Sequence, residues 1–228
     1  MKPVIRIDIV SDVVCPWCYI GKRRLEKAMD ELKDQYAFDV SYHPFELNPA
    51  IPKEGRDQKE YLTSKFGGAS KYEQITNHVS SIAAAEGIEF NFNRQDISPN
   101  TRDAHRIINL AAEHGVQKIV VEALFKAYFT DGTDLSKTSN LVAVASSAGL
   151  DKDVVEKLLS SDDKIAEVIA AETQMQSNGI TGVPFYIVNN KYGVSGAQTS
   201  STFIDAFRQI GKEIETSAEA CDVSDPNC

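Results

Sequence analysis

The chain is organised around the stretch Val14-Cys15-Pro16-Trp17-Cys18-Tyr19. Residues 4–10, just before it, alternate apolar and polar side chains as a strand does. Residues 22–29, just after it, are rich in strong helix formers. Two cysteines at such a junction lie in the first helical turn, where unpaired N–H groups and the helix dipole favour a thiolate. The pattern predicts a reversible dithiol, with Cys15 attacking and Cys18 resolving.

Other uses of this cysteine pair fit the sequence less well. Haem attachment requires a histidine after the second cysteine, where Tyr19 stands. A structural zinc site needs a second close pair of ligands, but six residues separate the remaining cysteines, Cys221 and Cys228. The four histidines supply no ligand set, so we expect no metal. A redox dithiol is therefore favoured over a zinc site or an inert structural pair.

Composition limits the class of protein and its partners. With 228 residues, 42% of them hydrophobic, the chain can form one large domain or a small domain carrying an insertion. A formal charge of -9 argues against non-specific binding to nucleic acid or to an anionic membrane. No apolar run has the length of a membrane span, and the N-terminus lacks a leader pattern. We therefore expect a cytoplasmic protein, in which such cysteines are more often catalytic or sensing than structural.

The order of the predicted elements indicates an α/β fold with an insertion. A strand over 4–10, a helix over 15–35 and a strand over 38–45 make a βαβ unit with a parallel pair of strands. Helical patterns follow over 57–66, 70–86, 101–114, 116–130, 138–148, 152–159 and 162–178. Strand patterns at 183–188 and 191–195, around Asn189-Asn190, predict a hairpin, and residues 202–214 predict a closing amphipathic helix.

These elements suggest two domains and a tail. Residues 1–50 and 179–214 are expected to form one discontinuous domain, with residues 51–178 as an inserted helical domain. Residues 215–228 are polar and acidic and contain two cysteines, so we expect a mobile C-terminal tail.

Five motifs occur in one chain in a characteristic order. They are Val13-Val14-Cys15-Pro16-Trp17-Cys18-Tyr19-Ile20-Gly21, Pro44-Phe45-Glu46-Leu47-Asn48-Pro49, Asn100-Thr101 with Ala104-His105-Arg106, Gly182-Val183-Pro184-Phe185, and Ser195-Gly196-Ala197-Gln198. Over residues 4–212 this order resembles the FrnE-type branch of the DsbA family of thiol–disulfide oxidoreductases. The resemblance implies a thioredoxin-like fold with a large all-helical domain inserted between the βαβ half and the ββα half.

The resemblance also implies roles for individual residues. Cys15 would attack, Cys18 would resolve, and Pro184 would be cis and face the Cys15 sulfur. A cis bond there would turn the Val183 backbone toward an extended substrate strand. Pro16 suits a helix start for backbone reasons alone. Pro16, Trp17, Val183 and Pro184 are expected to contact the substrate. Trp17 would shape substrate contact on the exposed rim, although a core position is the alternative.

Several further residues have two interpretations each. Asn100, His105 and Arg106 would line a groove facing the dithiol, whereas His105 is otherwise an ordinary helix residue with a satisfied hydrogen bond. Glu46 is either a buried carboxylate that tunes proton transfer to Cys18 or a solvated residue at a strand end.

The two cysteines of the tail also have two interpretations. Cys221 and Cys228 would form a second redox pair, as relatives of this type commonly carry one, but the spacing here is wider than usual. The alternative is two free thiols in a frayed tail.

The expected activity is thiol–disulfide exchange with protein or peptide thiols and disulfides through a mixed disulfide. No cofactor beyond the dithiol is expected, and glutathione is a candidate redox partner. The alternative is a glutathione-dependent isomerase or transferase of the 2-hydroxychromene-2-carboxylate isomerase or kappa-class type. Those proteins typically have serine in place of Cys15 and lack Cys18. A non-catalytic binding module is disfavoured because both sulfurs are retained. Substrate, net redox direction and a monomeric or dimeric state stay open.

Overall fold

The computed structural model describes the backbone of residues 2–222 and the side chains of residues 2–214 and 216. Its central sheet has the strand order β2-β1-β5-β6. Strands β1 (Val4–Ser11) and β2 (Ala37–Pro44) are parallel, as predicted. Strands β5 (Phe185–Val188) and β6 (Tyr192–Ser195) form the predicted antiparallel hairpin, and β5 pairs antiparallel with β1. Asn189 and Asn190 have φ values of 50° and 53° and are the central residues of a turn in which the Lys191 N–H donates to the Val188 carbonyl at 3.0 Å.

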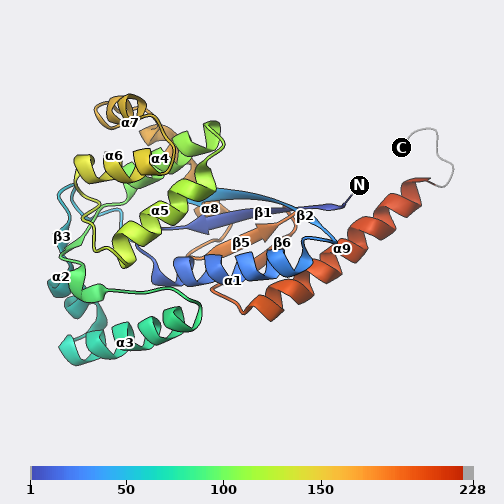
Figure 1. The fold of residues 1–228 in the computed structure, drawn as a ribbon, viewed down its shortest axis with the longest axis horizontal. Coiled ribbons are helices and arrows are strands. Elements are labelled where there is room, and N and C mark those ends of the chain that lie inside the picture. Colours follow the sequence, from blue (N-terminus) through green and yellow to red (C-terminus); the bar gives the residue numbers. More distant parts are fainter. Residues whose placement is uncertain (1, 223–228) are drawn as a thin grey trace.

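One face of the sheet is covered by α1 (Pro16–Leu32) and α9 (Ser200–Asp222), which lie side by side (Figure 1). The buried face of α1 carries Ile20, Leu25, Ala28 and Leu32 at helical spacing, and these residues join the main core. The closing helix is longer than expected, because α9 continues through residues 215–222, which we predicted to be part of a mobile tail. This burial orients α1 with its dithiol end toward the inserted helices (Figure 1).

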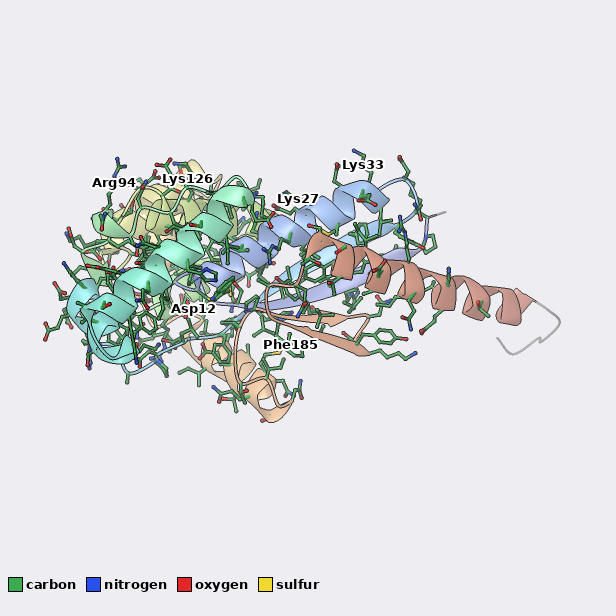
Figure 2. The ribbon with its side chains drawn as sticks, turned by 90° about the horizontal axis from the view of Figure 1, so that it is seen from below. Asp12, Lys27, Lys33, Arg94, Lys126 and Phe185 are labelled. Atoms are coloured by element: carbon green, nitrogen blue, oxygen red, sulfur yellow. The ribbon has the colours of Figure 1, made fainter. Side chains whose placement is uncertain are left out.

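The opposite face of the sheet packs on α8 (Ile165–Ser177), as Figure 2 shows on the side that carries Phe185. A smaller apolar cluster of Val10, Phe45 and Ile180, with Met175 of α8 against it, fills this interface. Alternation along β1 explains both cores, because Ile5, Ile7 and Ile9 point to the main core and Val10 points to the smaller one.

The insertion is formed mainly by helices. In chain order its remaining elements are β3 (Arg56–Asp57), α2 (Gln58–Phe66), α3 (Ala69–Ala85), η1 (Phe92–Arg94), β4 (Ile97–Ser98), α4 (Arg102–Glu113), α5 (Gln117–Phe129), α6 (Thr138–Ser147) and α7 (Lys152–Leu159). The predicted helices are present within a few residues of their expected bounds. The ladder between β3 and β4 was not expected, because two residues per strand are too few to show alternation. Within the described residues, no helix is both long and apolar enough to cross a membrane.

Contacts between α1 and α5 hold the dithiol end of α1 against the insertion. The Tyr19 ring stacks on Phe125 with centroids 4.9 Å apart. The Tyr19 hydroxyl donates to Glu122 at 2.8 Å, and Arg23 bonds the same carboxylate at 2.7 Å. Lys22, which is 5% exposed, also pairs with Glu122. The Glu122 carboxylate of α5 therefore binds three side chains of α1: the buried Lys22 ammonium, the Arg23 guanidinium and the Tyr19 hydroxyl.

Candidate active site

Both cysteines of the C-x-x-C stretch lie at the start of α1, as the sequence predicts. Cys15 is the N-cap residue, with an extended backbone (φ -90°, ψ 112°), and Pro16 occupies the first helical position. The N–H groups of Cys18 and Tyr19 both donate to the Cys15 carbonyl, at 3.0 and 3.4 Å. No acidic residue lies in the first turn, and both cysteines are free thiols. The positive end of the helix therefore acts on the sulfurs without a nearby acidic side chain on the same turn.

The loop before β5 lies beside the first cysteine. The Cys15 thiol donates to the Val183 carbonyl oxygen at 3.6 Å. The peptide bond between Val183 and Pro184 is cis, which confirms that part of the prediction. The substrate-binding roles assigned to Val183 and Pro184 stay predictions.

The two sulfurs differ in their access to a cavity. Cys15 and Cys18 are both almost completely buried. Cys15, however, lines a cavity of about 330 Å³, whereas Cys18 is not among its lining residues. The walls come from the start of α1, the loop after β2, α2, α3, residues 92–101, the end of α5 and Val183. A molecule in this cavity would meet Cys15 and not Cys18.

Large apolar side chains are exposed at this cavity. Trp17, Leu47 and Ile75 are 37%, 39% and 42% exposed, and all three line it. The exposed position expected for Trp17 is confirmed, and its role with substrate stays a prediction. Pro16 also lines the cavity. Exposed apolar side chains that gather around one concavity are typical of a binding site rather than of an inert surface.

The second sulfur is held as a thiol. Burial, followed by the hydrogen bond and charge of Cys15, raises the pKa of Cys18 well above its usual range. The Ser11 hydroxyl and the Asp12 backbone act in the opposite direction, but more weakly. A buried thiol with a raised pKa is a poor nucleophile toward an external disulfide, because the thiolate is the reactive form.

Asp12 is a site residue that the sequence analysis missed. Its side chain is fully buried beneath the loop that leads to Cys15, where the strand-bearing half meets the inserted helices (Figure 2). One carboxylate oxygen accepts the Val14 N–H at 3.4 Å and the other accepts the Leu47 N–H at 2.8 Å. His105 Nε2 lies 3.6 Å from Oδ1. We interpreted Ser11-Asp12 only as a turn, because a single carboxylate beside a serine does not show from the local sequence whether it is buried.

Glu46 is buried, so the alternative of a solvated strand-end residue is wrong. Its Oε1 accepts from Arg102 Nε at 2.9 Å and from Nη2 at 2.8 Å. Its backbone N–H donates to Glu172 Oε1 at 2.7 Å. The main influences on the pKa of Cys18 are burial, Cys15, Ser11 and Asp12, so direct tuning by Glu46 stays a prediction.

The expectation that Asn100, His105 and Arg106 line the groove does not hold, because none of them lines the cavity. Asn100 donates to the Ile51 carbonyl at 2.9 Å and accepts the Arg102 N–H at 3.0 Å. The Arg106 guanidinium, which is buried, pairs with Asp103 and donates to three carbonyls between residues 158 and 163. These contacts tie the start of α4 to neighbouring loops.

The second cysteine pair and metal binding involve residues that are only partly described. The backbone of Cys221 belongs to α9, but its side chain and all of Cys228 lie outside the described residues. Within the part of the chain that is described, no group of three or more His, Cys, Asp and Glu residues is arranged to hold a metal ion.

Comparisons with known proteins place this geometry in context. A family model described as a DSBA-like thioredoxin domain matches residues 6–208. The crystal structure of a probable DsbA oxidoreductase from Streptomyces coelicolor is 34% identical to this chain, with a TM-score of 0.84, and the match covers 90% of this chain and 89% of that one. An uncharacterized Bacillus subtilis protein, YwbO, is 26% identical over 213 residues, covering 92% of this chain and 98% of its own length.

A more distant solved structure shares the fold alone. It is that of the cytosolic disulfide reductase DsbM from Pseudomonas aeruginosa with GSH, which is 17% identical with a TM-score of 0.62. The match covers 94% of this chain and 99% of that one.

Proposed function

This chain belongs to the family of DSBA-like thioredoxin domains, and from that premise we propose that it exchanges disulfides with protein and peptide clients through Cys15 and Cys18. The proposal rests on one observation, which is that the two sulfurs differ in their access to the cavity. Cys15 lines the cavity at the start of α1, and Cys18 lies one turn later, outside it. An attacking sulfur must reach the client, and a resolving sulfur must reach only its neighbour.

The exchange proceeds in two steps. The Cys15 thiolate attacks one sulfur of a client disulfide, so a mixed disulfide forms and the other client sulfur leaves as a thiolate that takes up a proton. Cys18 then loses its proton and attacks the Cys15 sulfur, which releases the first client sulfur as a thiolate. The client disulfide is reduced to two thiols, and the Cys15–Cys18 dithiol is oxidised to a disulfide. The reverse sequence oxidises a client dithiol.

The cavity supports a polypeptide client. About 330 Å³ accommodates one or two large side chains, and its exposed rim is apolar. A client whose cysteine is close in sequence to a large apolar residue would bury that residue while its sulfur meets Cys15. Burial of one such side chain contributes roughly 1.5–3 kcal/mol.

The test is reduction of insulin by dithiothreitol, followed by turbidity, with the wild type, Cys15→Ser and Cys18→Ser. We expect acceleration by the wild type and none by Cys15→Ser. Cys18→Ser should accumulate a mixed disulfide with the client, because the resolving step is lost. A double variant, Cys221→Ser with Cys228→Ser, is the matched control for loss of thiols elsewhere. A wild type that neither accelerates turbidity nor reactivates scrambled ribonuclease would exclude the proposal.

Glutathione is the proposed redox partner, which would reduce the Cys15–Cys18 disulfide again after a client has been reduced. The structure of DsbM, which shares the fold, was solved with GSH. Activity as a glutathione-dependent isomerase or transferase is the alternative prediction. It is disfavoured because those proteins typically have serine in place of Cys15 and lack Cys18, whereas both sulfurs are present here. Conjugation of glutathione to an electrophile that persists in Cys18→Ser would favour that alternative.

Two further proposals concern location and the tail. We place the protein in the cytoplasm, as DsbM is named cytosolic, and fractionation of expressing cells tests this. A cytoplasmic glutathione pool favours reductase or isomerase work. Cys221 and Cys228 are proposed as an auxiliary pair that exchanges with the main dithiol, and mass spectrometry of alkylated tail peptides after redox titration tests that exchange.

A further inference from the structure

Five charged or titratable side chains meet beneath the loop that carries the dithiol. Asp12 comes from that loop, Glu46 follows β2, and Glu172 lies on α8, while Arg102 and His105 come from α4. Arg102 bonds Glu46 through two nitrogens. The charges of Arg102 and His105 both act on Glu172, and within this described cluster His105 is the cation that lies against Asp12.

His105 is 2% exposed, and its Nε2 atom has no hydrogen-bond partner. At 3.6 Å from Asp12 Oδ1, the attraction is between charges rather than through a closed hydrogen bond. Burial alone lowers the pKa of His105, but Asp12 first, and then the charges of Glu172 and Glu46, raise it overall. The nearby carboxylates therefore favour the imidazolium form of His105 over the neutral form.

Two other groups complete the electrostatic surroundings. Burial, followed by the charge of Glu46, raises the pKa of Glu172 above its usual range, although the charges of His105 and Arg102 and the Glu46 N–H act to lower it. From α5, Tyr128 faces Asp12, and burial is the main cause that raises its pKa and keeps it neutral. Among the three carboxylates, Asp12 acts most strongly on His105.

The backbone of Asp12 connects this charge pair to both sulfurs. Its carbonyl accepts the Cys15 N–H at 3.0 Å, and its backbone hydrogen-bonds Cys18. A net charge on the pair therefore acts on the dithiol over a short distance, in a site that little water reaches.

We propose that His105 is a positioning residue which, by neutralising the buried Asp12 carboxylate, stabilises the reduced, thiolate-bearing form of the Cys15–Cys18 dithiol. The inference rests on the proposed function, because it assumes that this dithiol cycles. Without the imidazolium, the uncompensated Asp12 carboxylate opposes a thiolate but has little effect on the uncharged disulfide. Loss of His105 therefore shifts the equilibrium toward the disulfide.

The test measures the equilibrium in which one oxidised protein and two glutathione thiols give the protein dithiol and one glutathione disulfide. For His105→Gln at pH 7 we expect the equilibrium constant to fall about tenfold, which corresponds to a potential about 30 mV more negative. The double variant Asp12→Asn with His105→Gln removes both charges and should return to within about twofold of the wild type. As pH rises through the raised His105 pKa, the wild type loses the imidazolium and should converge on His105→Gln.

A second histidine–carboxylate pair supplies the matched control. His43 Nε2 lies 2.7 Å from Asp8 Oδ1 on the central sheet, and Asp8 is three residues, about 10 Å, before the end of β1 that leads to Asp12. His43→Gln should leave the equilibrium constant unchanged. If the double variant does not fold, Glu172→Gln combined with His105→Gln should recover part of the tenfold loss.

The possible outcomes separate the inference from the proposed function. A wild type that does not equilibrate with glutathione contradicts the function itself. A wild type that equilibrates, with an equal constant for His105→Gln across the pH range, overturns the inference and leaves the function standing. Equal falls in His105→Gln and the double variant would also overturn it, because they indicate a structural rather than an electrostatic effect.

Discussion

Replacing Glu122 with Gln tests how the dithiol helix is held against the insertion. Glu122 bonds the Tyr19 hydroxyl and Arg23 and also pairs with Lys22. Lys22 pairs with Glu26 as well, at 2.6 Å. Removing one partner of a fully buried ion pair costs about 3–5 kcal/mol. The Glu122 side chain is 34% exposed, so solvent screening reduces the expected loss to about 2 kcal/mol of unfolding free energy.

The assay is chemical denaturation of the wild type and Glu122→Gln, supported by thermal melting. For a chain of this size, about 2 kcal/mol corresponds to a fall in melting temperature of roughly 4–8 °C. Asp131→Asn is the matched control, because Asp131 pairs with Lys126 of the same helix, and both side chains are largely exposed. That control should cost less than about 1 kcal/mol. Equal losses in the two variants would refute the argument that the buried ammonium makes Glu122 special.

The same carboxylate predicts a pH dependence. Burial alone raises the pKa of Glu122, but hydrogen bonds and charges from Lys22, Arg23 and Tyr19 lower it overall, below 4.5. Because the folded-state pKa is lower than the unfolded one, the contribution of Glu122 is complete above the unfolded pKa of about 4.3. It is lost as pH falls through the folded pKa. The difference in unfolding free energy between wild type and Glu122→Gln should therefore shrink below about pH 4.5, measured by denaturation from pH 3 to 7.

The remaining predictions concern packing beside the site and the cavity. A Cβ atom at Gly21 would collide with the buried Tyr186 hydroxyl, so Gly21→Ala should destabilise the fold by about 2 kcal/mol in urea denaturation. Gly182→Ala, where nothing lies within 4 Å of the added atom, should be nearly neutral, and a stable Gly21→Ala would contradict this packing. Ile75→Trp at the cavity mouth should lower kcat/KM about tenfold for peptide disulfides with a large apolar neighbour, without slowing oxidation of the dithiol by glutathione disulfide. Ile119→Trp, on α5 and 58% exposed, should leave both rates unchanged, and an equal effect of the two substitutions would exclude the cavity as the client site.

Local sequence patterns predicted much of the fold. The strand before Cys15, the hairpin at Asn189-Asn190 and the inserted helices were all predictable, because periodicity, capping and turn residues act within one element. The bounds of α9 were not, because helical structure continues through residues 215–222, where the sequence shows few apolar positions.

The residues around the dithiol were predictable only in part. The local C-x-x-C pattern located Cys15 and Cys18, and resemblance to a family added the cis peptide bond at Pro184. It misplaced Arg106, whose guanidinium bonds loop carbonyls rather than facing a groove. It also gave no indication of Asp12, because a single carboxylate in a turn has the same local sequence signature whether it is buried or solvated.

By itself the sequence determined the dithiol at the start of a helix, the order of the elements and the location of the insertion, because these depend on neighbours within a few helical turns. Tertiary packing alone decided which sulfur lines the cavity and which charges meet beneath it. Asp12 meets His105 across 93 residues of chain, and Glu46 meets Glu172 across 126. Burial removes the water that would otherwise screen such charges, so their effect on the sulfurs exists only once the insertion has closed over the loop.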